Sequence, residues 1–185
     1  MHAQDSAGFR SGYPAMDRFA LSINHGGLLN FGPIIHVEMG LTQHLRIDTH
    51  MRFLSLGLAY QFYHSYTDVS APPAPGLGIV YCFGNHIHKP YITVMGEYGF
   101  NKNKSWQQND AWKYETYHLA VIGIGGGYRF RLPNRIFFGL GGYVFIAWGK
   151  KSSIYSYQEE DDLHWYDFRM DRPRIMLDLR IGFEF

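Results

Sequence analysis

The chain has very little cysteine and almost no preference for one sign of charge. Cys82 is the only cysteine among 185 residues, so neither an intrachain disulfide nor a cysteine-rich zinc site can form. Its thiol is expected to serve as a small side chain. Lysines and arginines number 17 against 16 acidic residues, which leaves a net charge of +1. That balance gives no basis for a nucleic-acid partner.

Long apolar runs are missing as well. No stretch approaches the roughly 18 apolar residues that a membrane-spanning helix needs, and helical periodicity is almost absent. MHAQDS at residues 1–6 is either the remnant of a signal peptide, with HAQ at the cleavage position, or an initiator methionine followed by an ordinary terminus. We expect residues 1–16 to be a flexible segment and residues 17–185 to form one domain.

What the chain does have is alternation of two unlike faces. Aromatic residues make up 17% of it and there are 21 glycines. At 174–185, RIMLDLRIGFEF places apolar residues at every odd position and mostly polar or charged ones at the even positions, which is the period of a β-strand. Similar patterns predict strands at 17–25, 32–42, 45–63, 76–84, 90–101, 115–131, 136–150 and 172–185.

Two boundaries among these strands need an argument. The odd apolar phase runs unbroken from Phe19 to Leu41, but the glycines and the proline within residues 26–33 break strands, so we place a turn there. An even number of strands also lets both termini lie on one side. In the third strand the apolar phase flips from odd at Phe53 to even at Leu54, which predicts a β-bulge.

The predicted connections alternate between short and long. The short ones lie at 41–45, 84–90 and 131–135, and the long polar ones at 64–76, 101–115 and about 150–172. Outer-membrane barrels have tight turns at one end and longer loops at the other. The pattern therefore favours an all-β fold, an eight-stranded antiparallel up-and-down transmembrane β-barrel.

Alternation alone leaves open whether the apolar face points into a soluble, lipocalin-like barrel or out into lipid. Eight strands enclose a lumen that side chains only just fill, and roughly forty bulky apolar side chains would not fit comfortably there. The opposite face supplies glycines, Ala147, Ser22, Asn24 and charged residues of both signs, which pack into a narrow lumen. Aromatic residues near the strand ends match interfacial girdles. The membrane barrel is therefore preferred over the soluble one.

Two segments carry a resemblance to known proteins. RIMLDLRIGFEF resembles the C-terminal strand by which the insertion machinery recognises bacterial outer-membrane barrels. GIGGGYRFRLPNRIFFGLGGYVF at 123–145 is similar to small eight-stranded proteins of the OmpA/OmpX transmembrane type, the "outer membrane protein β-barrel domain" families. The resemblance implies a bacterial outer-membrane location, contact with outer-membrane lipid and lipopolysaccharide, and Phe183 and Phe185 as the signal for the barrel-insertion machinery. It implies no cofactor.

Charged and histidine side chains of both signs fall on the inward face. Buried charge is tolerated only when it is paired and hydrogen-bonded, so we predict an ion-pair network that fills the lumen. The alternative is a proton or solute path. The predicted set is His36, Glu38, Arg46, Asp48, His50, Arg52, Glu97, Arg129, Arg131, Asp178, Arg180 and Glu184.

Three other patterns could carry chemistry, and each has a simpler interpretation. His64 and Ser65 could form a lipid A deacylase pair, but neighbours on a strand face opposite sides and the strand motif of such enzymes is absent. His86 and His88 could hold Zn²⁺ or Cu²⁺, although a polar turn explains them. The acids at 159–162 could hold Ca²⁺ but lack the glycine spacing of a calcium loop. We therefore expect no cofactor and no enzymatic activity.

Tyrosine and tryptophan are enriched at binding surfaces, and they gather in the long polar connections. The leading hypothesis is a non-enzymatic barrel that is structural, adhesive or complex-forming, with another envelope protein bound through these loops. The alternatives are a lipid A-modifying hydrolase or acyltransferase, and a narrow solute or ion channel. The candidate contact residues are Trp106, Trp112, Tyr155, Tyr157, Trp165 and Tyr166.

Overall fold

The structure is a computed structural model of the chain that describes residues 19–29, 32–53, 67–84, 88–106, 112–155, 165–169 and 172–185. Among the described residues, no helix is long and apolar enough to cross a membrane. These residues form antiparallel strands and one short 3-10 helix, η1 (Gly26–Leu29). The strands are β1 (Phe19–Asn24), β2 (Ile34–Gly40), β3 (Leu45–Arg52), β4 (Thr67–Ser70), β5 (Ala74–Cys82), β6 (His88–Trp106), β7 (Trp112–Arg131), β8 (Ile136–Tyr155), β9 (Trp165–Arg169) and β10 (Arg174–Glu184).

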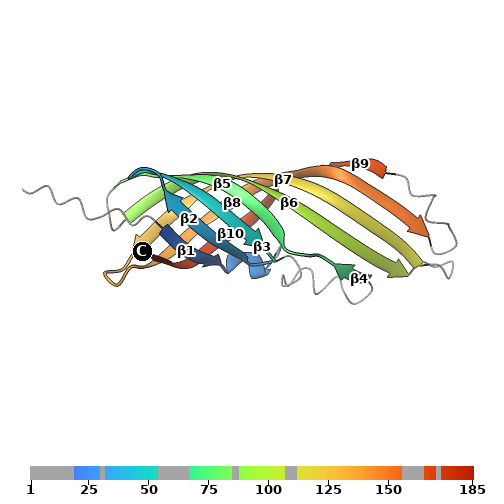
Figure 1. Cartoon of the computed structure of the whole chain (residues 1–185), viewed down its shortest axis with the longest axis horizontal. Coiled ribbons are helices and arrows are strands. Elements are labelled where there is room, and N and C mark those ends of the chain that lie inside the picture. Colours follow the sequence, from blue (N-terminus) through green and yellow to red (C-terminus); the bar gives the residue numbers. More distant parts are fainter. Residues whose placement is uncertain are drawn as a thin grey trace, which may run out of the picture.

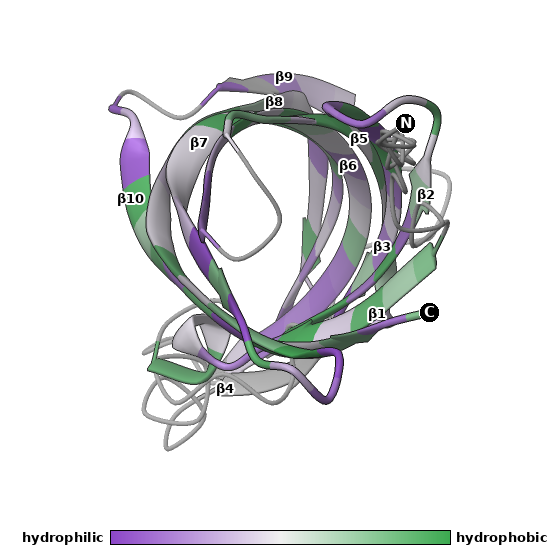
Figure 2. Cartoon of the chain, turned by 90° about the vertical axis from the view of Figure 1, so that its left-hand side faces the viewer, coloured by the Kyte–Doolittle hydropathy of each residue, from purple (hydrophilic) through white to green (hydrophobic). Residues whose placement is uncertain are grey.

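Eight of these strands close into a ring. The hydrogen-bonded order β10-β1-β2-β3-β5-β6-β7-β8 returns from β8 to β10, and the closed ring is visible end-on in Figure 2. The first and last strands pair from Ala20↔Glu184 to Asn24↔Arg180. At the end of this seam, Phe19 and Phe185 exchange two backbone N–H···O hydrogen bonds of 2.9 Å. The predicted eight-stranded antiparallel barrel is confirmed.

The turn between the first two strands is also confirmed, and η1 lies within it. The Asn24 side-chain oxygen accepts hydrogen bonds from the backbone N–H groups of Gly26 at 2.9 Å and Leu179 at 3.1 Å. A Cβ on Gly26 would lie 2.2 Å from the carbonyl oxygen of Leu177. Only glycine therefore lets η1 approach β10 so closely.

The apolar face of the barrel points outward. Leu177 and Ile181 of β10 are 40% and 49% exposed, whereas their neighbours Asp178 and Arg180 are 0% and 2% exposed. β1 and β2 follow the same alternation of exposed and buried residues. This arrangement agrees with the predicted orientation and places the charged side chains in the lumen.

Three strands extend beyond the predicted segments and are much longer than the first strands of the ring. β6, β7 and β8 have 19, 20 and 20 residues, compared with 6 to 8 in β1, β2 and β3. They continue past the ring at the end opposite the C-terminus (Figure 1). There β4 pairs with the outer part of β6, and β9 with the outer part of β8.

The prediction of long loops was therefore wrong in several places. Residues 101–106, 112–115 and 151–155, expected as polar connections, belong to β6, β7 and β8. Part of the connection at 64–76 forms β4, and part of the one at 150–172 forms β9. These backbones pair with one another as far as Trp106↔Trp112, so their N–H and C=O groups are satisfied whatever the polarity of the side chains.

Two other expectations fall partly or wholly outside the described residues. β3 ends at Arg52 rather than at the predicted residue 63. Residues 54–66, and with them the proposed bulge, lie outside the described part of the chain, as does the N-terminal segment 1–16.

Candidate functional site

The lumen contains an ion-pair network centred on Glu38 of β2. Its carboxylate accepts a pair of hydrogen bonds from Arg129 of β7, at 2.6 and 3.0 Å, and one from Arg180 of β10 at 3.1 Å. Arg46 of β3 places its Nε 2.9 Å from the same carboxylate. Glu38 is fully buried, so one carboxylate links four strands of the ring.

The network continues toward the end of the barrel that carries the short turns. Glu184 lies 3.4 Å from Arg129 and 3.4 Å from Arg131, and 3.8 Å from the ammonium of Lys89. The side chains of Arg131 and Lys89 are 20% and 14% exposed, whereas Glu184 is fully buried. The two most exposed cations of the network therefore lie at this end.

A second group of charges adjoins the first and lies farther from the short turns along the lumen. Arg52 donates two hydrogen bonds to Glu97, at 2.7 and 2.6 Å. His50 lies between two carboxylates, with Nδ1 2.9 Å from Asp48 and Nε2 3.3 Å from Glu97. His36 Nδ1 contacts both oxygens of Asp48, at 3.1 and 3.0 Å. The chain of contacts thus runs from β2 through β3 to β6.

His36, Asp48 and His50 are the residues of the described lumen that could hold a metal ion, because their ligand atoms lie within 4.8 Å of one another. Their arrangement is that of a hydrogen-bonded triad. Each Nδ1 is directed at a carboxylate oxygen about 3 Å away, and a metal on that line at about 2 Å from the nitrogen would collide with the oxygen. The present geometry therefore fits hydrogen bonds rather than an ion held by Nδ1.

Several uncharged side chains that were not predicted from the sequence also fill the lumen. Tyr91 donates a hydrogen bond to Asp178, and Arg180 donates one to Tyr143. Tyr91 shares the parity of Glu97 on β6, so its inward position was open to prediction. Farther along the lumen, an apolar cluster packs across the barrel, formed by Ile34, Met95, Tyr143, Phe145 and Met176.

The structure places all twelve predicted lumen residues at inward strand positions and joins them by ion pairs or hydrogen bonds. Arg131 is the most exposed, and the other eleven are buried. Cys82 is buried against Val80 and Tyr91, in agreement with its expected role as a small side chain.

The predicted partner-contact residues do not form one surface. Trp112 and Trp165 lie at outward positions of β7 and β9, whereas Tyr155 and Tyr166 have the opposite parity. Trp165 and Tyr166 are 42% and 55% exposed. Tyr157 and the side chain of Trp106 lie outside what the structure describes.

An aromatic cluster lies on the outer surface where the apolar band ends. The Tyr98 hydroxyl lies 2.6 Å from Nδ1 of His118, and the His118 ring makes edge contacts with Phe100 at 4.8 Å and Trp165 at 5.0 Å. Beside this cluster are two adjoining hollows of about 480 and 510 Å³ that share Trp148 and Gly149.

Beyond the cluster, a smaller polar group lies on the inward side of the extended strands. Glu115 is 2.8 Å from the ammonium of Lys113 and accepts hydrogen bonds from Tyr117 and Ser153. Burial alone would raise the pKa of Glu115, but Lys113 and the hydroxyl donors lower it below its ordinary value. Burial, together with the charge of Glu115, raises the pKa of Tyr117 to about 12.

The predicted insertion residues lie on the outer surface at the barrel seam. Phe183 and Phe185 are 43% and 52% exposed. Their rings stack at 6.1 Å, and Phe185 also stacks on Phe19 at 6.0 Å. The C-terminal aromatic residues therefore lie against the first strand.

Most of the remaining candidate site residues predicted from the sequence lie outside the part of the chain that the structure describes. His64, Ser65, His86 and the acids at 159–162 lie outside the described residues. His88 begins β6, and its ring packs near Phe130 at 5.6 Å and Tyr128 at 5.9 Å. In the structure, His88 is thus part of an aromatic contact on the barrel surface.

Comparisons with known proteins support the fold through a solved structure. No protein-family model matches the chain, and a search of curated proteins finds no match. Among solved structures, a major outer membrane protein from Thermus thermophilus is similar, with a TM-score of 0.50 over 90% of this chain and 98% of that one. The sequences are 11% identical, so the similarity concerns the fold, and the chain has the fold of an outer-membrane β-barrel.

Proposed function

We propose that this protein resides in a bacterial outer membrane, that its barrel neither conducts nor catalyses, and that it binds a partner of the cell envelope at the sheet beyond the barrel. The observation that carries the proposal is the unequal length of the strands. A tilted strand needs about 9 to 11 residues to cross a bilayer, whereas β7 and β8 have 20 residues each. About half of each strand therefore extends outside the lipid.

The outer surface of the barrel supports the membrane location. Leu77, Ile79, Ile92, Val94 and Ile124 are between 52% and 63% exposed, which is unfavourable in water and favourable in hydrocarbon. The apolar band ends at the paired row of Tyr98, Ala120 and Trp148. Tyrosine and tryptophan at such a boundary are typical of a membrane interface.

The packed lumen supports a barrel without conduction. An ion passing through would have to part the pairs of Glu38 and of Glu97, and then displace the apolar cluster around Met95 and Met176. Breaking one side of a buried ion pair costs about 3–5 kcal/mol. Such a path is slow compared with an open pore.

The extended sheet supports partner binding. Within the described part of the chain, β4 pairs only with β6, and β9 only with β8. Strand edges of this kind accept a strand from another chain. The neighbouring surface offers Tyr114 and Trp112 beneath the ammonium of Lys104, which lies 4.2 Å from the centre of the Trp112 ring.

Location and partner binding can be tested separately. Detergent-dependent extraction and heat-modifiable gel migration are expected of the membrane barrel, and full solubility without detergent would contradict it. In cells, a photo-crosslinking residue at Tyr166 or Trp112 should give a discrete protein adduct. The matched control is Ile175, which is 75% exposed on the lipid face and should give only lipid adducts. Absence of a protein adduct at both Tyr166 and Trp112 would refute partner binding.

A second candidate, a lipid-modifying hydrolase, rests on one observation. His118 and the Tyr98 hydroxyl are hydrogen-bonded at 2.6 Å on the face that meets the lipid headgroups, where an imidazole could act as a general base. Lipid A mass spectra from cells with and without the protein test this candidate. Identical spectra would remove it, and a mass change that His118→Ala abolishes would support it.

A further inference from the structure

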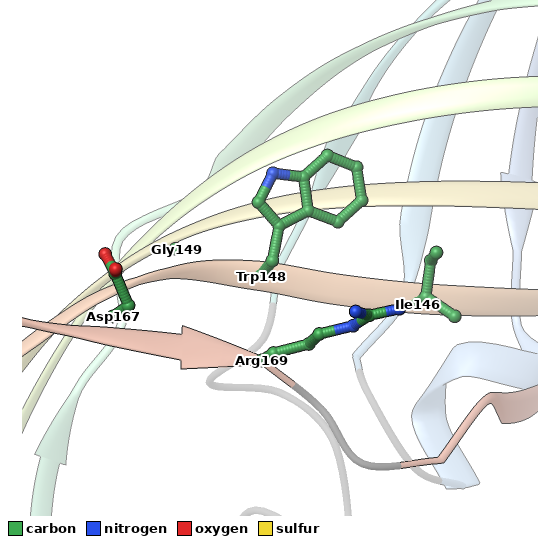
Figure 3. Close-up of a pocket in the computed structure, with 5 residues that line it drawn as sticks. All are labelled: Ile146, Trp148, Gly149, Asp167 and Arg169. Atoms are coloured by element: carbon green, nitrogen blue, oxygen red, sulfur yellow. The ribbon is translucent and has the colours of Figure 1, made fainter.

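The two hollows beside Trp148 form one cleft across the outward faces of β7, β8 and β9. Its lining includes Ala120 and Gly149, which have little or no side chain, together with His118 and Trp165. Figure 3 shows its other part, where Arg169 extends from β9 toward Ile146 of β8. The cleft is open to its surroundings, and its size is within the range of small-molecule sites.

The register of the strands explains why these residues meet. Tyr98, Ala120, Trp148 and Arg169 form one row of directly paired neighbours across four strands. The next row outward pairs His118 with Lys150, and Lys150 with Asp167. Neighbours of this kind lie about 5 Å apart, so the cleft is part of the strand register and not of a loop.

The lining residues change character along the strands. Toward the barrel, the cleft opens onto Ile146, which is 40% exposed, and onto the apolar band of Ile122 and Ile124. Outward, the lining residues carry the cations of Lys150 and Arg169, and Asp167 is the one acid among the described residues that line the two hollows. Lys150 and Arg169 outnumber Asp167, so the lining favours a ligand that is anionic at one end and apolar at the other.

We propose that this cleft binds one anionic phospholipid molecule of the surrounding bilayer. Its phosphate lies between Lys150 and Arg169, and its acyl chain follows Ile146 along the barrel wall. Arginine suits a phosphate because its guanidinium donates paired hydrogen bonds, and lysine adds a point charge. The site rests on the membrane placement proposed above, since the apolar end of the cleft is continuous with the lipid-facing band.

The test uses the full chain in nanodiscs, with Trp148 as the only tryptophan after Trp106, Trp112 and Trp165 are changed to Phe. Brominated acyl chains quench tryptophan on contact. Brominated phosphatidylglycerol in a phosphatidylcholine disc should therefore quench Trp148 more strongly than brominated phosphatidylcholine at the same mole fraction. Lys150→Gln or Arg169→Gln should each lower this preference by roughly fivefold, and added salt should lower it in the wild type.

The matched control is Lys104→Gln. Lys104 lies four residues beyond Phe100 on β6, about 13 Å farther from the bilayer along the strand, and its substitution should leave the preference unchanged. Equal quenching by both lipids, or an unchanged preference in both cleft variants, would overturn the proposal. Loss of the preference on addition of inorganic phosphate, beyond the loss that sodium chloride causes at the same ionic strength, would also overturn it, because free phosphate would then replace the lipid at the site.

A reporter in the apolar band separates this proposal from the membrane placement. Ile124 is 63% exposed on β7, and Ile124→Trp in a background where Trp148 is also changed to Phe should be quenched by both brominated lipids alike. No quenching of the tryptophan introduced there would refute the membrane placement. Quenching there without headgroup preference at Trp148 would refute only the lipid site.

Discussion

Glu38→Gln is the most informative single change in the lumen. The substitution keeps the shape of the side chain and removes its charge, which leaves Arg129, Arg180 and Arg46 around a neutral amide. At an effective dielectric constant of 20, each pair at about 4 Å between charge centres contributes about 4 kcal/mol of attraction. The gross loss over three pairs is therefore about 12 kcal/mol.

Most of that sum is offset within the barrel. Arg129 retains Glu184 at 3.4 Å and Arg180 retains Asp178 at 2.8 Å, and the wild-type carboxylate itself was costly to dehydrate. We therefore expect the free energy of unfolding to fall by about 3–5 kcal/mol, the range found when one partner of a buried pair is removed. Urea-induced unfolding from lipid vesicles, followed by tryptophan fluorescence and gel shift, measures it.

Two further variants make the result decisive. Glu115→Gln removes a carboxylate that pairs with Lys113 outside the membrane band, and should cost less than about 1 kcal/mol. Glu38→Gln combined with Arg46→Met should be less destabilised than the sum of the two single variants, because Arg46 pairs with Glu38. A loss below about 1 kcal/mol for Glu38→Gln, or strict additivity of the pair, would refute the view that the network stabilises the barrel.

Particular contacts lead to four other predictions. A Cβ at Gly182 would lie 2.4 Å from the Phe137 ring and 2.6 Å from Ser22. Gly182→Val should therefore lower the free energy of unfolding by about 1–3 kcal/mol. Gly96→Val is the control and should leave the free energy of unfolding unchanged, because a Cβ there meets its nearest neighbour at 3.8 Å. Because the folded-state pKa of Glu115 is depressed, its contribution to the outer hairpin is present above the ordinary pKa and is lost as pH falls through the folded value. Because the pKa of Tyr117 is raised to about 12, its contribution to the stability of the hairpin is complete below pH 10 and is lost as pH rises toward 12. Trp112 fluorescence as a function of pH tests both predictions. Glu115→Gln should abolish the change at low pH, and Tyr117→Phe the change at high pH. Phe185→Ala should reduce the heat-modifiable fraction formed in cells more than the fraction refolded in detergent, if Phe185 is read by the insertion machinery; equal losses in both assays would assign it a packing role with Phe19 alone.

The parts of the structure that follow from strand period were predictable. In β10 the alternation assigned Asp178 and Arg180 to the lumen and Leu177 and Ile181 to the outside, because a strand buried on one face must keep its register. The turn before β2 was predictable because glycine and proline interrupt a ladder. The same parity, extended to Tyr91 and Tyr143, would have identified the two phenols of the network.

The partners within the lumen were not predictable from local sequence. Glu38 and Arg129 are 91 residues apart and meet because the stagger of a closed barrel sets which inward positions share a level. The lengths of β6, β7 and β8 were missed for a different reason. Outside lipid, neither face of a strand needs an apolar band. Residues such as Lys102 and Asn103 therefore do not show the alternation of apolar and polar residues that marks a strand in the membrane.

The ion pairs of the lumen and the long outer strands, which the sequence did not predict, have a common physical basis that bears on function. Inside the bilayer, each strand must satisfy lipid on one face and a narrow charged lumen on the other, so a residue such as Glu38 is held by side chains from three other strands. A change there alters stability before it alters any specific activity. Beyond the row of Trp148 both constraints end, while the backbone ladder of β7 and β8 continues and still fixes side-chain positions. Residues on this hydrogen-bonded extension are under neither constraint, which is why we expect the contacts with lipid headgroups and with a partner there.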